Sequence, residues 1–190
     1  MKINSLSLIS VVSVLTCAST ANAAVLADFY IGGMAGVGGQ TTSAEGKHKT
    51  ESSRVYGGIV GMDLPIFRVE GEYNYFDSSD LDTNAAMLNV YAKIPSVFVL
   101  PYLGAGMGVV FGGKQTFTED GVKKEYSINS TSAYQAMLGA TIDIFSLPIK
   151  FDVEGRILYA PDIYKIETAT TTTTPDMLQY GVRAKMRYIF

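Results

Sequence analysis

Hydrophobic and polar residues alternate with a period of two along several stretches of this chain, and many of the polar members are charged. Residues 67–75, FRVEGEYNY, place Phe, Val, Gly, Tyr and Tyr on one face and Arg, Glu, Glu and Asn on the other. Residues 151–157, FDVEGRI, and 180–190, YGVRAKMRYIF, repeat the pattern. A helix does not fit it, because charges at every second position would circle the helix axis. The pattern predicts β-strands with one apolar and one charged face.

Five further stretches, 29–37, 56–64, 86–94, 101–111 and 134–143, alternate less strongly. The residues expected to share an apolar face are Phe29, Ile31, Gly33, Ala35, Val37; Tyr56, Gly58, Val60, Met62, Leu64; Ala86, Leu88, Val90, Ala92, Ile94; and Tyr134, Ala136, Leu138, Ala140, Ile142. The opposite face is expected to carry Met87, Asn89, Tyr91, Lys93, Gln135, Met137, Thr141 and Asp143. In the glycine-rich stretch 101–111, Gly104, Gly106 and Gly108 are expected inside. The total is about eight strands, the size of a small barrel.

The connections between these strands alternate in length. Pro65, Pro95 and Pro148 mark tight turns, whereas the polar stretches 38–53, 77–84, 112–131 and 160–176 are expected to be long loops. Short turns at one end and long loops at the other are typical of an up-and-down antiparallel barrel that spans an outer membrane. A soluble β-sandwich, the alternative, would not sort its loop lengths so regularly. The predicted fold class is an all-β transmembrane up-and-down antiparallel β-barrel.

The N-terminus predicts export. Lys2 precedes an apolar stretch from Leu6 to Leu15, and small residues then lead to Ala21-Asn22-Ala23. This order is typical of a cleaved secretory signal, so we expect residues 1–23 to be a signal peptide and residues 24–190 the barrel domain. A membrane anchor is the alternative, but the apolar run is well short of the roughly 20 residues that a spanning helix needs. A lipoprotein acylated at Cys17 is a further alternative, but the preceding residues VLT fit such an acylation site poorly.

Composition narrows the remaining classes. Without residues 1–23 the chain has 190 − 23 = 167 residues, no cysteine and a net charge of −3 − 1 = −4. Disulfides and thiol chemistry are therefore not expected, and a mildly acidic chain is not expected to bind nucleic acid. Hydrophobic residues make up 47% of the sequence, yet no uncharged apolar run near 18 residues follows Ala23. This combination fits a barrel better than a helical membrane protein.

The charges on the inner faces balance. The inward or turn-side acids are Asp28, Asp63, Glu70, Glu72, Asp143, Asp152 and Glu154, and the bases are Arg68, Lys93, Lys150, Arg156, Arg183, Lys185 and Arg187. An isolated charge in a narrow lumen would lose its hydration. We therefore expect ion pairs inside the barrel and a lumen filled by polar side chains rather than an open pore.

The C-terminal strand carries the most specific motif. Val182, Ala184, Met186, Tyr188 and Phe190 share one face and end in an aromatic residue. This arrangement resembles the assembly signal of bacterial outer-membrane barrels, which the barrel-insertion machinery recognises. A strand with one apolar face and an unpaired edge can pair with another sheet.

The whole segment 24–190 resembles the small eight-stranded barrels that include the OmpA transmembrane domain and the opacity-type surface proteins. The strings DFYIGG at residues 28–33 and PYLGAG at 101–106 are similar to the opacity-type group. The resemblance implies a monomer in the bacterial outer membrane, surrounded by its lipids. It also implies loops that bind a host or environmental ligand.

We find no catalytic or metal site in the sequence. The single histidine, His48, has Ser43, Glu45, Glu51, Ser52 and Ser53 nearby, but a polar loop is a poor place for preorganised geometry. Alternation alone explains the spacing of Glu70/Glu72 and Asp152/Glu154, for which Arg68 and Arg156 are available partners. Asp77, Asp80 and Asp82 lack the pattern of a calcium loop, so a solvated acidic loop is expected. The chain is expected to need no cofactor and to have no enzymatic activity.

Two classes of function remain. The first is a surface protein whose four loops bind ligands, as an adhesin or surface antigen would; the second is a structural role in the membrane or a narrow channel for small solutes. Loops of mixed charge on a rigid scaffold favour the first. The threonine-rich stretch Thr168 to Thr174 lies in the last of these loops, and its role does not follow from its composition.

Overall fold

The structure of the protein, a computed structural model, describes residues 27–44, 47–78, 81–96, 98–119, 122–127, 130–144, 147–161, 166–168, 171–173 and 176–190. The expected signal peptide, Cys17 and the expected mature start Ala24 lie outside this part of the chain. The strands are β1 Asp28–Ala44, β2 Lys47–Asp63, β3 Phe67–Ser78, β4 Leu81–Lys93, β5 Val99–Glu119, β6 Val122–Ser127, β7 Thr131–Asp143, β8 Ile149–Ala160, β9 Ile166–Thr168, β10 Thr171–Thr173 and β11 Asp176–Ile189. Among the described residues, no helix is long and apolar enough to cross a membrane.

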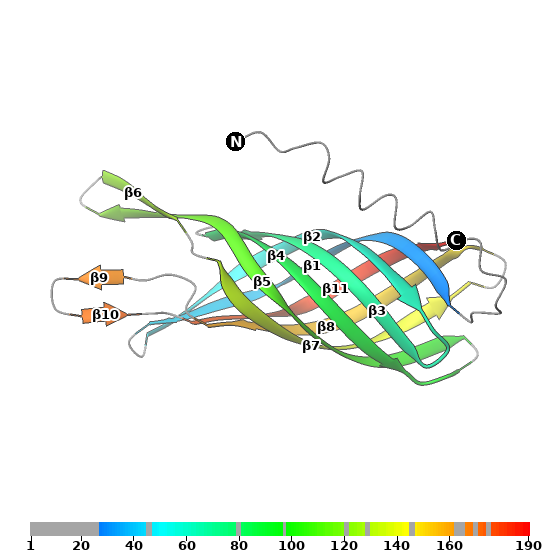
Figure 1. The fold of residues 1–190 in the computed structure, drawn as a ribbon. Coiled ribbons are helices and arrows are strands. Elements are labelled where there is room, and N and C mark those ends of the chain that lie inside the picture. The colour runs from blue at the N-terminus through cyan, green and yellow to red at the C-terminus, as the bar shows by residue number, and fades with distance from the viewer. Residues whose placement is uncertain are drawn as a thin grey trace, which may run out of the picture.

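Eight of these strands form a closed antiparallel barrel (Figure 1). Their order is β4-β3-β2-β1-β11-β8-β7-β5, and pairing of β4 with β5 completes the circle. The first and last strands lie side by side, with Tyr30 opposite Ile189 and Val37 opposite Val182. This confirms the predicted fold class and the count of eight strands. The closure removes the free strand edges that an open sheet would leave.

The two ends of the barrel differ. One end, which we call the turn end, carries the short turns at Pro65, Pro95 and Pro148, and the backbone N–H of the C-terminal Phe190 donates to the carbonyl of Phe29 there, at 2.9 Å. The other, the hairpin end, carries the connections β1–β2, β3–β4, β5–β7 and β8–β11. There β5 continues past the barrel and pairs with β6, while β9 and β10 form a separate two-stranded sheet (Figure 1).

The predicted long loops are wrong in extent. Within 38–53, β1 runs on to Ala44 and β2 already begins at Lys47, with Gly39 opposite Ser52. Within 112–131, β5 and β6 pair from Glu119–Val122 to Lys114–Ser127. The polar residues mark where the strands leave the apolar band. Backbone ladders do not need apolar side chains, so the strands continue beyond it.

The inward and outward faces agree with the prediction. In β3 every second residue from Arg68 is buried, and in β8 every second residue from Asp152 is. Outward residues such as Leu138 and Val153 are exposed. Gly104 is buried, as predicted. The position requires glycine, because a Cβ there would collide with the Tyr91 ring.

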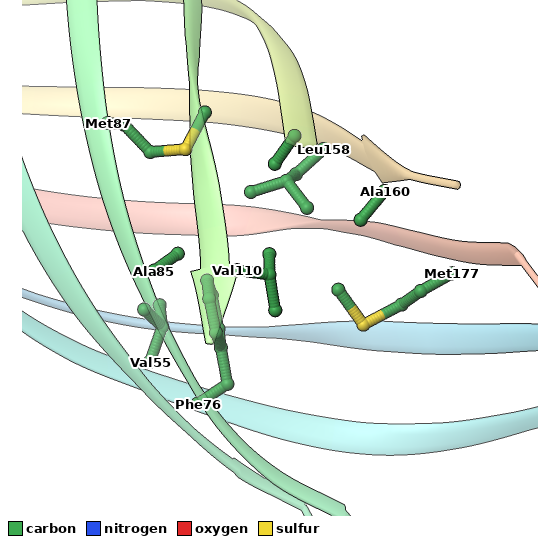
Figure 2. Close-up of a cluster of buried hydrophobic side chains, with 9 residues drawn as sticks. Val55, Phe76, Ala85, Met87, Val110, Leu158, Ala160 and Met177 are labelled. Carbon is green, nitrogen blue, oxygen red and sulfur yellow. The ribbon is translucent and has the colours of Figure 1, made fainter. Parts of the chain in front are cut away.

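The lumen is filled, as predicted, but at the hairpin end its filling is apolar and not polar. A cluster of buried apolar side chains lies there, contributed by seven strands and shown in Figure 2: Val55, Phe76, Ala85, Met87, Val110, Ala133, Leu158, Ala160 and Met177. We call it the apolar plug. Along β8 the inward residues change from Asp152, Glu154 and Arg156 to Leu158 and Ala160. The lumen therefore has a charged section toward the turn end and an apolar section toward the hairpin end.

Candidate functional site

The charged section of the lumen begins at the turn end with Asp63. Its carboxylate pairs with Lys93 on one side, and the guanidinium Nη1 of Arg187 lies 3.0 Å away on the other. Beside it, Lys150 lies 3.3 Å from Asp143, and both side chains are partly exposed. These pairs form the rim of the lumen.

Asp152 is the centre of the next layer. Arg187 donates to it from Nε at 2.7 Å and from Nη2 at 3.0 Å, and the Thr141 hydroxyl also donates. Arg68 approaches the same carboxylate at 3.4 Å. The Arg68 guanidinium lies 4.0 Å from the centroid of the Tyr91 ring and 4.5 Å from that of Tyr102, so two aromatic faces cover a fully buried cation.

Lys185 joins two carboxylates in the middle of the barrel. Its Nζ lies 2.7 Å from Glu70 and 3.2 Å from Glu154. Glu70 also accepts hydrogen bonds from the hydroxyls of Tyr30 at 2.7 Å and Tyr91 at 2.9 Å. Buried carboxylates with several donors avoid much of the cost of losing their hydration.

Arg183 occupies the following layer. It donates to Glu72 from Nη1 at 2.6 Å and Nη2 at 2.9 Å, and to Glu154 from Nε at 2.6 Å. Arg156 lies 3.5 Å from Glu72, donates to Gln179 at 2.6 Å, and stacks 4.9 Å above the Phe76 ring. Arg156 thus joins the charged section to the apolar plug.

The structure brings the sequence-predicted ionic residues together. Nine of them are buried: Arg68, Glu70, Glu72, Asp152, Glu154, Arg156, Arg183, Lys185 and Arg187. Lys93 and Asp143 lie at the rim. Asp28, counted among the inward or turn-side acids, lies at the turn end opposite Asp63 and is exposed there.

The charges balance in both parts of the lumen. The buried acids are Asp63, Glu70, Glu72, Asp152 and Glu154, and the buried bases are Arg68, Arg156, Arg183, Lys185 and Arg187. The buried section is therefore neutral, at five against five. The turn end adds Lys93 and Lys150, which are matched there by Asp143 and the exposed Asp28.

The arrangement favours packing over chemistry. Each buried carboxylate contacts at least one cation, and no group of three potential ligands for a metal ion occurs among the described residues. Asp82 accepts a hydrogen bond from the backbone of Ser78 at 3.4 Å, whereas Asp80 lies outside the described residues. The side chains of His48 and of Thr168 to Thr174 also lie outside them.

Two aromatic collars surround the outer surface. The tyrosine collar, toward the hairpin end, consists of Tyr56, Tyr73, Tyr75, Tyr134, Tyr159 and Tyr180. The phenylalanine collar, toward the turn end, consists of Phe29, Phe67, Phe98, Phe151, Tyr188 and Phe190. Between them the exposed outward residues are apolar, among them Val60, Leu88, Leu103, Leu138 and Val153. Two aromatic girdles around an apolar band are typical of a barrel in an outer membrane.

The family outer membrane protein beta-barrel domain matches residues 8–185 of the sequence. The chain belongs to this family. It is therefore a bacterial outer-membrane β-barrel. Barrels of this kind have short turns on the periplasmic side and longer loops outside, so we refer to the turn end as periplasmic and to the hairpin end as extracellular. No curated protein matches it by sequence.

Solved structures of other outer-membrane barrels share the fold. Neisserial surface protein A (NspA) superposes with a TM-score of 0.56 at 15% identity, covering 85% of this chain and 97% of that protein. AlkL, solved by solid-state NMR in lipid bilayers, superposes with a TM-score of 0.54 at 13% identity, covering 90% and 94%. At these identities the likeness extends to the fold and no further.

In this outer-membrane barrel, the C-terminal residues predicted as an assembly signal all point outward. Val182, Met186, Tyr188 and Phe190 are exposed large side chains, and Ala184 is exposed between them. The Phe190 ring packs edge-on against Tyr188, with centroids 5.6 Å apart. Their strand, β11, pairs on both sides, with β1 and β8.

Proposed function

We propose that this outer-membrane barrel is a surface interaction protein, in which a rigid, filled barrel presents extracellular hairpins to a host or environmental ligand. The supporting observation is that strands continue beyond the tyrosine collar at the hairpin end. At the turn end the described strands do not continue in this way beyond the phenylalanine collar. In β2, residues 47–55 precede Tyr56, and β5 runs on from Phe111 to Glu119 and pairs with β6. Such extensions serve no need of membrane spanning, whereas loops and hairpins on a rigid scaffold are common sites of recognition.

The filled lumen supports this proposal over the narrow-channel alternative. Ion pairs and tyrosine hydroxyls occupy the lumen from Asp63 to Arg183, and the apolar plug follows. Eight strands enclose little more room than side chains fill. The other alternative, a purely structural role in the membrane, needs no hairpin extensions.

The hairpin sequences indicate the chemistry of the partner. Residues 45–51, EGKHKTE, and 119–125, EDGVKKE, each combine acidic and basic groups. Such surfaces suit a polar macromolecule better than an apolar solute. In this proposal the barrel acts as a monomer surrounded by outer-membrane lipids, uses the barrel-assembly machinery for insertion, needs no cofactor and catalyses no reaction. The lumenal ion pairs serve only to hold the scaffold rigid.

Replacing the hairpin tips one at a time tests the proposal. Residues 42–49, 113–128 and 162–175 would each become a two-residue Asn-Gly turn, and the matched control would replace 79–80 in the same way. We expect at least one replacement to abolish binding of the bacteria to host cells or serum proteins, with unchanged heat-modifiable migration on gels. Wild-type protein in liposomes should not release small solutes. Unchanged binding in every variant, together with leaky liposomes, would favour the channel.

A further inference from the structure

The three periplasmic turns consist almost entirely of apolar residues. Their sequences are LPI at 64–66, IPSVF at 94–98 and IFSLP at 144–148, and none of them contains a charge. Ile66, Phe98 and Leu147 are exposed, Phe98 to 69%. Apolar turns of this kind are unusual at a barrel end that stands in water, because turns are normally built from polar residues and glycine.

The apolar surface of these turns is continuous with the lipid-facing band. Phe67 and Val99, which directly follow two of the turns, are exposed members of the outward face, and Phe190 closes the same end. Most of the charges nearest the turns are paired at the rim of the lumen. Asp63 and Lys93 pair with each other, as do the partly exposed Asp143 and Lys150. Asp28, opposite Asp63, is exposed at the same end.

Part of the backbone of the turns is hydrogen-bonded within the protein. Leu64 N–H donates to the Phe67 carbonyl at 2.8 Å, and Leu147 N–H to the Ile144 carbonyl at 3.1 Å. Ile94 N–H donates to the Pro101 carbonyl at 2.8 Å. The three prolines of the turns have no N–H to satisfy. Internal hydrogen bonds of this kind lower the cost of placing a turn among lipid headgroups and acyl chains.

The two collars differ in a way that fits the same conclusion. Tyrosines of the extracellular collar have polar partners: Tyr73 donates to Asn84 at 2.7 Å and Tyr159 to Asp176 at 2.8 Å. The periplasmic collar is phenylalanine except for Tyr188. Tyrosine suits a boundary with one wet side, whereas phenylalanine has no polar group to place there.

We infer that the three turns insert into the periplasmic leaflet of the outer membrane, so that the phospholipid monolayer covers the rim of the barrel. The occupant of this surface is lipid, because the exposed apolar side chains of the turns continue the lipid-facing band through Phe67, Val99 and Phe190. The barrel thus ends within the leaflet instead of projecting into the periplasm.

The absence of tryptophan from the chain gives a direct test. Ile66→Trp, Phe98→Trp and Leu147→Trp, made singly in the full chain, would each report from one turn after purification and reconstitution into dioleoylphosphatidylcholine vesicles. Leu138→Trp gives the reference for a lipid-facing residue, and Ser52→Trp the reference for an aqueous one. Heat-modifiable migration identifies folded variants, and the three turns test the inference independently if one variant fails to fold.

We expect the turn tryptophans to show blue-shifted emission, strong quenching by lipids brominated on their acyl chains and little quenching by aqueous iodide, as for Leu138→Trp. In a thinner dilauroyl bilayer, iodide quenching should rise at the turns but not at Leu138→Trp. Iodide quenching equal to that of Ser52→Trp in vesicles free of other proteins would overturn the inference. The apolar rim would then be a docking surface for a periplasmic protein.

Discussion

Arg183 on β11 binds Glu72 on β3 through hydrogen bonds of 2.6 and 2.9 Å, although the two residues lie 111 positions apart in the sequence. Neither strand neighbours the other in the barrel, since β1 and β2 lie between them. The pair therefore crosses the lumen. It joins the strand that is synthesised last to one of the first, in addition to the backbone ladder between β1 and β11.

This relationship predicts strong coupling between the two residues. Arg183→Gln leaves the buried Glu72 carboxylate short of its main partner and should lower the free energy of unfolding by about 3–5 kcal/mol. In the double variant, Glu72→Gln removes the carboxylate that lost its partner, and Lys185, 3.2 Å from Glu154, still pairs with that residue. The double variant should therefore lose less stability than the sum of the two single variants. Urea titration of the protein refolded in detergent measures both. The exposed Arg54→Gln serves as control and should change stability by no more than about 0.5 kcal/mol. Additive losses would contradict a direct pair.

The free-energy cost of a charge on the outward face should depend on how deep the residue lies in the membrane. Val153 is exposed midway along β8, so Val153→Arg should cost roughly 2–4 kcal/mol in a bilayer. Ser132→Arg, outward but at the extracellular end of β7, should cost about 0–1 kcal/mol. Unfolding titrations in vesicles compare the two. If Val153→Arg is silent while the inward Gln135→Leu prevents assembly, the two faces have been assigned the wrong way round.

The sequence allows these faces to be predicted wherever one of them is charged. In β3 and β8 the alternation of charge and apolar residue leaves only one possible facing, and the structure agrees. The pattern disappears where both faces are apolar. Leu158 points inward between the outward Ile157 and Tyr159, and no sequence period separates three such neighbours. The sequence therefore predicts the inward position of Met87 but not the apolar plug as a whole.

The partners within the lumen depend on a quantity that the sequence does not contain. Which inward residues share a level is fixed by the stagger between strands as the barrel closes. Charge balance predicts that Glu72 has a basic partner, but not that Arg183 from β11 takes this place ahead of Arg68 or Arg156. The ends of the strands could not be predicted for a related reason. A change from apolar to polar residues shows where a strand leaves the lipid, but not where its backbone hydrogen bonds stop.

The packing of the apolar plug can be tested by the same substitution, leucine to alanine, at one inward and one outward position. Leu158→Ala removes a fully buried side chain and leaves a cavity, so it should cost about 2–5 kcal/mol. Leu138→Ala removes the same atoms from the outer face, where lipid or detergent fills the space, and should cost less than about 2 kcal/mol. Unfolding of both variants in the same detergent gives the comparison. Equal losses would show that the plug is loosely packed or filled by solvent.

Substitution of the C-terminal residue can separate an effect on assembly from an effect on stability. Phe190 is 71% exposed, and its backbone N–H, which donates to the Phe29 carbonyl, survives substitution by Asp. Every lumenal ion pair is untouched by this change. Protein with Phe190→Asp, refolded in detergent, should therefore form a barrel of nearly normal stability, since a residue at a strand end frays in any case.

In cells the same substitution should have a large effect if the last strand is an assembly signal. The insertion machinery would meet a terminal carboxylate in place of an aromatic ring, on the face that Tyr188 and Met186 share. We expect Phe190→Asp to accumulate in the periplasm and be degraded, whereas Phe190→Tyr, which keeps the ring, should insert normally. Fractionation of cells gives the amount inserted, and urea titration of the refolded protein gives the stability. If Phe190 only contributes to the phenylalanine collar, both variants should reach the outer membrane in normal amounts, and the proposed role of the C-terminal strand in assembly would have to be abandoned.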